Sequence, residues 1–327
     1  PFYQIYLLDL STGKNSQISS STGKATCAWI HPDGDKILFA STFLDKNSLI
    51  KQETELKKRK KNLGKKYAWD YDKNYDLFIK EIDSGAVQQI TDSVGYDAEG
   101  AISPDGEKII FSSNREYYKK GGDESKKEDL SFYCDIFLHN IDKNETIQLT
   151  DEDGYDGGPF FNSDGTKICW RRFSKNGHQA EIYTMDLKSR KEKQITNLGA
   201  MSWAPFFHPS DDYIIFATNL HGFNNFELYI IDSNGRGDPI RVTHRDGFDG
   251  LPSFSNDGMT LTWTSNKTSS KNSQIFMANW NHELALEKIR ATILRKKDAP
   301  TLDTRSNISN LDLLHYIKKL SSAEYNG

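Results

Sequence analysis

One short segment recurs along the chain and constrains its fold more than any other feature. Each copy joins a tight-turn signal to an alternating apolar run: HPDGDKILFAS (31–41), SPDGEKIIFSS (103–113), NSDGTKICWRR (162–172), HPSDDYIIFAT (208–218) and SNDGMTLTWTS (255–265). A turn of this kind beside an alternating apolar run predicts a β-hairpin. An internal repeat also decides the whole architecture, so every later assignment depends on it.

A second strand type follows each hairpin, and a copy of it stands alone at the N-terminus. The six copies are YQIYLLDLS, YDLFIKEID, CDIFLHNID, AEIYTMDLK, FELYIIDSN and SQIFMANWN. A short outer strand ending in Thr or Ser comes after all but the last: SQIS, VQQIT, TIQLT, KQIT and IRVT. Four short strands per unit, with a period of about 46 residues where no insertion intervenes, are typical of a β-propeller blade.

The strand count gives the expected number of blades. Six copies of the third strand against five hairpins predict an all-β, six-bladed β-propeller whose first blade, around residues 4–19, is incomplete in this chain. A five-bladed ring with a loose flap is the alternative, and it would leave exposed strand edges, which natural sheets avoid. We expect the propeller to span 1–282, with a short C-terminal helical linker over 283–327.

Two insertions interrupt the repeat, at 43–74 and 115–133. The first contains a basic stretch at 51–66, KQETELKKRKKNLGKK, which predicts a solvated helix or loop on the propeller face; the alternative is a docking surface for an acidic partner. The second is a polar loop without a chemical signature.

Composition narrows the function classes. A net charge of −4 gives no indication of nucleic-acid binding. No stretch reaches the roughly 20 apolar residues that a membrane-spanning helix needs. The low hydrophobic content of 36% beside 12% aromatic residues suits many short amphipathic strands. The chain begins with Pro1, so its own start does not report a compartment.

The candidate site comes from acidic triplets that precede three of the hairpins. GYD or GFD places Asp97, Asp156 and Asp249 at one repeat offset, so blade symmetry should bring them to one rim of the central channel. Glu99 lies two positions further on, and the fourth repeat has Ser202 and Trp203 at this place. Converging carboxylates could hold a calcium ion or the ammonium group of a peptide. The alternative is that each Asp caps its own loop.

A catalytic constellation is missing from the sequence. There is no GxSxG, HExxH or Walker motif, and no two of the eight histidines are spaced as metal ligands on one element. His221, in NLHGF, stands beside Gly222 in a predicted loop, where a structural role and a ligand contact both remain open. We therefore expect no catalytic residue in this chain.

Several stretches resemble a known group of proteins. YTMDLKSRKEKQIT followed by APFFHPS is similar to the TolB-type propeller repeat, a relative of the WD repeat. GKATCAWIHPDGDKILFAST, GYDAEGAISPDG, CWRRFSKNGHQAEIYTMDL, GAMSWAPFFHPS and TNLHGFNNFELY resemble the bacterial TolB-like propellers found alone or fused ahead of secreted di-zinc aminopeptidases. This resemblance covers about residues 2–282. The tail, 307–327, resembles the opening helix of the aminopeptidase domain, and the chain ends before any zinc ligand.

The resemblance implies a function for the module. It would be the non-catalytic propeller of an exported, periplasmic or secreted bacterial di-zinc aminopeptidase, screening or orienting peptides or docking the downstream peptidase domain. Zinc would then belong to that domain alone. The rival is a stand-alone TolB-like protein-interaction module of the cell envelope. A third alternative is a propeller hydrolase or lyase with a channel metal, against which the missing histidine cluster argues.

Overall fold

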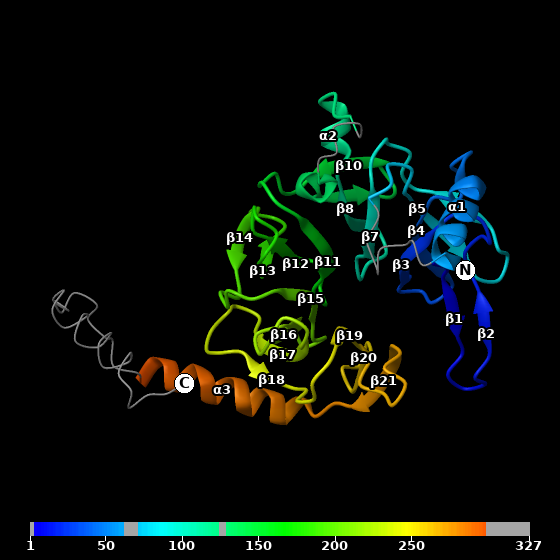
Figure 1. Ribbon diagram of the computed structural model, residues 1–327. Coiled ribbons are helices and arrows are strands. Elements are labelled where there is room, and N and C mark those ends of the chain that lie inside the picture. The colour runs from blue at the N-terminus through cyan, green and yellow to red at the C-terminus, as the bar shows by residue number, and fades with distance from the viewer. Residues whose placement is uncertain (1–2, 62–70, 124–128, 299–327) are drawn as a thin grey trace, which may run out of the picture.

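The computed structural model describes residues 3–61, 71–123 and 129–298 (Figure 1). Within these ranges, four antiparallel sheets of four strands and one of three surround a common centre. Their strands are β3 (Ala25–Ile30), β4 (Lys36–Ser41), β5 (Asp76–Glu81) and β6 (Val87–Gln89); β7 (Asp97–Ile102), β8 (Lys108–Ser113), β9 (Asp135–Asn140) and β10 (Glu145–Gln148); β11 (Asp156–Phe161), β12 (Lys167–Phe173), β13 (Ala180–Asp186) and β14 (Lys191–Gln194); β15 (Ser202–Phe207), β16 (Tyr213–Thr218), β17 (Glu227–Asp232) and β18 (Ile240–Arg241); and β19 (Asp249–Phe254), β20 (Thr260–Ser265) and β21 (Gln274–Asn279).

The prediction of six blades is wrong, because the described residues form a five-bladed propeller. Residues 4–19 contribute only β1 (Tyr6–Leu8) and β2 (Asn15–Gln17), which pair with each other in a separate two-stranded sheet. This small sheet packs against the first blade, where Ile18 is buried beside Ala25 and Phe39. The sequence count failed because it treated every copy of the third-strand motif as a blade, whereas this copy has no inner strands beside it among the described residues.

Each inner strand contains a β-bulge at the same place. The pairing of the first strand with the second shifts register after the second residue in all five blades. The third residue is left-handed every time, with φ between 49° and 59°: Cys27, Glu99, Gly158, Ala204 and Leu251. Four of these are not glycine, so the bulge holds a conformation that costs an L-residue about 1–2 kcal/mol. Its recurrence in every blade makes the bulge a feature of the fold.

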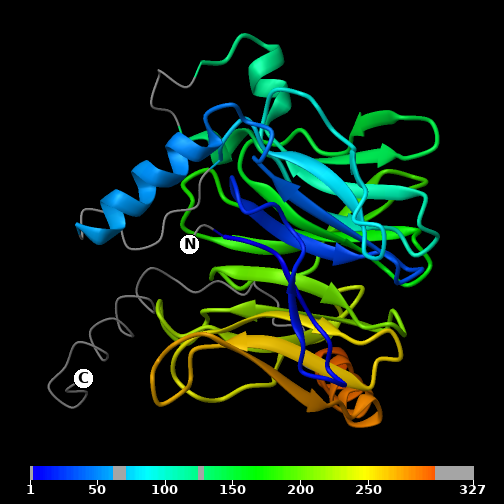
Figure 2. The same ribbon diagram turned by 90° about the vertical axis from the view of Figure 1, so that its right-hand side faces the viewer.

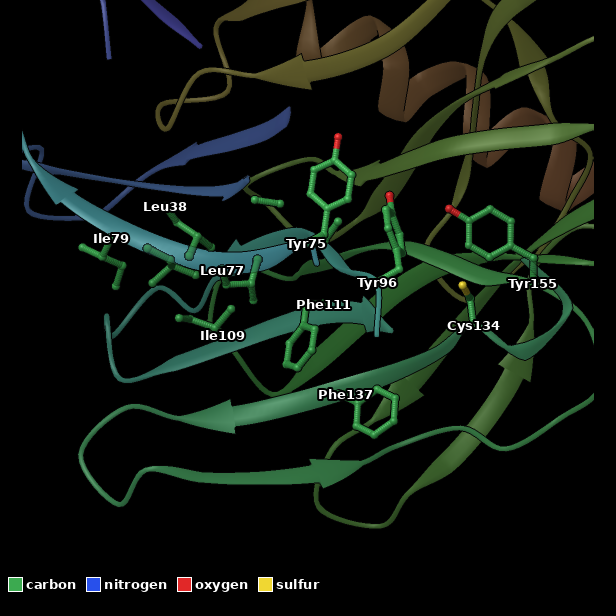
Figure 3. Close-up of a cluster of buried hydrophobic side chains, with 13 residues drawn as sticks. Leu38, Tyr75, Leu77, Ile79, Tyr96, Ile109, Phe111, Cys134, Phe137 and Tyr155 are labelled. Carbon is green, nitrogen blue, oxygen red and sulfur yellow. The ribbon is translucent and has the colours of Figure 1, made fainter. Parts of the chain in front are cut away.

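The core lies between successive sheets. Figure 3 shows the cluster between the first two blades, where Leu38, Leu77 and Ile109 form an aliphatic end. At the other end Tyr75, Tyr96 and Tyr155 gather, and the Tyr155 hydroxyl points towards Tyr96. The tyrosine hydroxyls thus make one end of this otherwise apolar core polar.

The helices lie outside the blades. The basic insertion forms α1 (Ser48–Lys60), while 62–70 fall outside the described residues. The second insertion contains α2 (Arg115–Lys119) and the 3-10 helix η2 (Leu130–Tyr133). α3 (His282–Asp298) confirms the short C-terminal helix, and it packs on the fourth blade through Ala285 and Ile289 (Figure 2). The tail from 299 onward is outside the described residues.

Candidate functional site

The three predicted aspartates occupy equivalent places, at the first residue of β7, β11 and β19. All are buried, with Asp97 and Asp156 0% and Asp249 3% exposed. Each pairs with a basic side chain of its own blade. The Arg115 guanidinium binds Asp97, the Arg172 guanidinium lies 2.7 Å from Asp156, and Lys267 Nζ lies 2.6 Å from Asp249. The predicted rim therefore consists of three buried ion pairs, one in each of three blades.

The structure does not bring these three carboxylates together. Among the described residues, the one group of three possible metal ligands whose atoms lie within 4.8 Å of one another is His31, Asp33 and Asp35. That group lies on a hairpin turn, and both aspartates are exposed. A calcium ion at Asp97, Asp156 and Asp249 stays a prediction, and it would have to compete with the guanidinium and ammonium groups already paired there.

A second set of carboxylates lies beside the first. Asp76 and Asp135 begin the third strands β5 and β9. Burial, followed by the nearby charge of Asp97, raises the pKa of Asp76 to about 7. Burial, followed by the charge of Asp156, raises the pKa of Asp135 to about 8. With these raised pKa values, both carboxyl groups favour proton uptake on folding near neutral pH. An aspartate in an exposed loop would stay ionised at that pH.

We expect Asp135→Asn to flatten the dependence of stability on pH. Because the folded pKa of about 8 exceeds the ordinary value of 3.8, Asp135 contributes its full stabilisation of the fold below pH 3.8. This contribution is lost as the pH rises towards 8. The melting temperature of the wild type should fall more steeply than that of the variant between these pH values, and the exposed Asp142→Asn should follow the wild type. Parallel curves for the wild type and Asp135→Asn would contradict this assignment.

Glu99 belongs to a different cluster, near the propeller axis. Its carboxylate accepts a hydrogen bond from Arg171 Nη2 at 2.9 Å, from the Tyr96 hydroxyl at 3.2 Å and from the Tyr155 hydroxyl. The side chains of Glu99 and Arg171 are 9% and 8% exposed. Burial raises the pKa of Tyr96 and Tyr155, so both hydroxyls keep the proton that they donate. We call Glu99, Arg171, Tyr96 and Tyr155 the axial cluster.

Arg171 is placed by its aromatic neighbours. Its guanidinium carbon lies 4.8 Å from the ring centre of Tyr155 and 5.6 Å from that of Trp203. A Cβ on Gly158 would lie 2.3 Å from Arg171 Nη1, so glycine is needed there for the guanidinium to fit. Among the residues that the structure describes, no group accepts a hydrogen bond from the buried Arg171 Nε. The axial cluster therefore contains an unused donor, and such a group is costly to leave without an acceptor.

The basic insertion is anchored at this cluster. Tyr71, where the described chain resumes within the insertion, packs its ring 5.0 Å from Tyr96 and 5.7 Å from Tyr155. Ser41 pairs with Ala25 and Ser113 with Asp97, so both insertions leave the blades at the end where the inner strands begin. The axial cluster and the two insertions thus share one face of the propeller.

The other predicted site residues divide between this cluster and the rest of the fold. Trp203 contacts the cluster through Arg171. Ser202 is buried and donates to Thr218 Oγ1 at 3.4 Å. His221 is exposed in the loop after β16, with its ring 6.2 Å from that of Tyr229. Cys27 is no candidate nucleophile, because burial and then the charge of Glu99 raise its pKa to about 12.

Comparisons with known proteins agree with this fold. Residues 159–292 match the TolB beta propeller domain family (PD40). TolB from Acinetobacter baumannii superposes with a TM-score of 0.62 at 16% identity, over 84% of this chain and 57% of that one. The fold is a TolB-like β-propeller. This chain thus spans just over half the length of that TolB, and fusion to a di-zinc aminopeptidase stays a prediction.

Other similar structures have quite different activities. The oligogalacturonate lyase of Vibrio parahaemolyticus has a TM-score of 0.53 at 16% identity, over 84% of this chain and 69% of the lyase. The tricorn protease has a TM-score of 0.51 at 16% identity, over 83% of this chain and 24% of the protease. No curated protein sequence matches this chain. At such identities the likeness concerns the fold, and the function must be argued from the site.

No helix among the described residues is both long and apolar enough to cross a membrane.

Proposed function

We propose that this chain is a non-catalytic binding module that holds peptide segments against the axial cluster. The observation that carries the proposal is the unused Nε donor of Arg171, buried between Glu99, Tyr155 and Trp203. A peptide carbonyl or carboxylate would satisfy this donor. The Glu99 carboxylate offsets the positive charge of Arg171, and the rings of Tyr155 and Trp203 supply apolar surface. Binding sites commonly combine a few polar groups with such apolar surface.

The same proposal gives the module a place in a larger protein. Following the resemblance of the sequence, we propose an exported bacterial protein, periplasmic or secreted, in which the propeller screens or orients peptides for a di-zinc aminopeptidase domain or docks that domain. Zinc would be held by the peptidase domain. The alternative is a stand-alone TolB-like interaction module of the cell envelope. Sequencing the gene beyond codon 327 separates the two, because only the first predicts paired zinc ligands downstream.

We expect the purified chain to retain a subset of peptides from a tryptic digest of serum albumin. The chain and digest are mixed, unbound peptides are removed by gel filtration, and those retained are identified by mass spectrometry. Arg171→Lys keeps the charge but loses the planar fork and its Nε donor, so it should lose most of this subset. Lys175→Met, which changes an exposed ion pair with Asp153, is the matched control and should retain it. An unchanged subset with Arg171→Lys would overturn the proposal.

A further inference from the structure

The outer edge of the fifth blade differs from that of the other four. In those blades a fourth strand covers the third: β6 on β5, β10 on β9, β14 on β13 and β18 on β17. Among the described residues, β21 is the last strand of its sheet, and no strand pairs with its outer edge. Figure 1 shows β21 at the end of the ring. An open edge presents backbone N–H and C=O groups that can pair with another strand.

The covered edges share one arrangement of hydrogen bonds. In the four covered blades the second residue of the third strand donates its N–H to a Thr hydroxyl at 2.9 Å, and its C=O accepts the N–H of the apolar residue before that Thr at 2.7–2.8 Å. Ile5, just before β1, makes the same two bonds with Ser19 and Ile18, just after β2, both at 2.8 Å. The apolar residue and the hydroxyl residue are, in chain order, Ile18–Ser19, Ile90–Thr91, Leu149–Thr150, Ile195–Thr196 and Val242–Thr243. Five copies of one arrangement show what this kind of edge binds.

Ile275 is the equivalent residue of β21. Gln274 pairs with Ser265 as Asp76 pairs with Ser41, so the N–H and C=O of Ile275 point away from β20, as those of Leu77 point away from β4. The Ile275 side chain is 76% exposed, whereas its counterparts are 0% exposed: Leu77, Ile136, Ile182 and Leu228. The apolar residue of each outer strand packs in the same cluster as this second residue. Ile275 therefore presents an apolar contact as well as a backbone edge.

The first residue of the strand defines the chemistry further. In three of the four covered blades and at the N-terminus the hydroxyl also donates to this residue, for example Thr196 to Glu181 at 2.5 Å and Ser19 to Gln4 at 2.5 Å. β21 begins with Gln274, whose equivalent at the N-terminus is Gln4, two residues before β1, and Gln274–Asn279 contains no charged side chain. We therefore expect a strand that pairs with the outer edge of β21 to have an apolar residue followed by Ser or Thr, and no charged residue at this point.

We propose that the edge of β21 binds an extended segment of a partner protein, antiparallel to β21, through an apolar–Ser/Thr pair. The apolar residue lies on Ile275 and gives its N–H to the Ile275 carbonyl. The hydroxyl accepts the Ile275 N–H and donates to Gln274. This is strand addition to a sheet edge, with main-chain bonds providing affinity and the pair providing selectivity. It lies on an edge of the molecule that the axial cluster does not use.

The experiment uses a fluorescent peptide KNSQISS, which copies residues 14–20, and the whole chain. Fluorescence anisotropy should show saturable binding with a Kd below about 1 mM. Ile275→Lys should weaken it by at least about tenfold, because the apolar contact is lost. Val87→Lys is the matched control, since Val87 is also an exposed apolar residue of an edge strand, and it should bind as the wild type.

Changes in the peptide test the backbone part of the proposal. Replacing its isoleucine by proline removes the N–H donor and should abolish binding. Hydrogen exchange should slow at Ile275 and Met277 when the peptide is bound. Three results would overturn the proposal: no saturable binding, equal binding to Ile275→Lys, or self-association of the chain through this edge in sedimentation, which would make a second copy the occupant.

Discussion

Arg171→Met should lower the free energy of unfolding by about 3–5 kcal/mol. The substitution leaves the Glu99 carboxylate buried without its cation, since the Glu99 and Arg171 side chains are 9% and 8% exposed. Removing one partner of a buried pair costs far more than replacing both. The Tyr96 and Tyr155 hydroxyls remain as donors to Glu99, so the protein should still fold. Urea denaturation of the two proteins at neutral pH measures the difference.

The double variant Glu99→Gln/Arg171→Met is the control for this effect. A neutral amide can remain buried with the tyrosine hydroxyls, so we expect the double variant to recover more than half of the lost stability. The non-additivity then reports the interaction itself. A single variant within about 1 kcal/mol of the wild type would show that the pair does not hold the two blades together.

Lys267→Met should have an effect of similar size at the other side of the propeller. Lys267 Nζ lies 2.9 Å from Glu227 and 2.6 Å from Asp249, and all three side chains are at most 6% exposed. Glu227 keeps Arg241, but Asp249 has no other ion pair among the described residues, and its Oδ1 is already without a hydrogen-bond partner. We expect a loss of about 3–5 kcal/mol in the free energy of unfolding.

The matched control for Lys267→Met is Lys175→Met. The Lys175–Asp153 pair has nearly the same length, 2.7 Å, but its side chains are 76% and 74% exposed. An exposed pair contributes at most about 1 kcal/mol, so this variant should melt close to the wild type. Equal losses for both lysines would mean that burial does not determine the strength of these pairs.

The repeat predicted the sheets but not the number of blades. Hairpin, third strand and outer strand all form where the turn signals and alternating residues place them, because these patterns are local. Whether β1 and β2 complete a blade depends on strands that must pair with β1, and local pattern carries no information on that. The bulge at Glu99 and its four counterparts was also missed, because four of the five residues are not glycine and give no signal of positive φ.

The sequence predicted the acidic partner of each of the three buried ion pairs but not the basic one. The repeat offset gave Asp97, Asp156 and Asp249, but their cations lie across the hairpin. The sequence did contain a signal for two of these cations. Arg115 and Lys267 each lie two residues after the second strand of a blade whose inner strand begins with Asp. The two blades that begin with Ala25 and Ser202 instead have Phe43 and Leu220 at that position. The Glu99–Arg171 pair had none, because 72 residues and a change of blade separate its members.

Hydrogen exchange of the chain with the retained albumin peptides tests the proposed binding function most directly. Mass spectrometry follows both the exchange and the intact mass of the peptides. Our account predicts slower exchange in 96–101 and around Arg171 and Trp203, with every peptide recovered whole. Protection confined to other segments, or shortening of the peptides that survives repurification and disappears on mutating a residue of this chain, would contradict it.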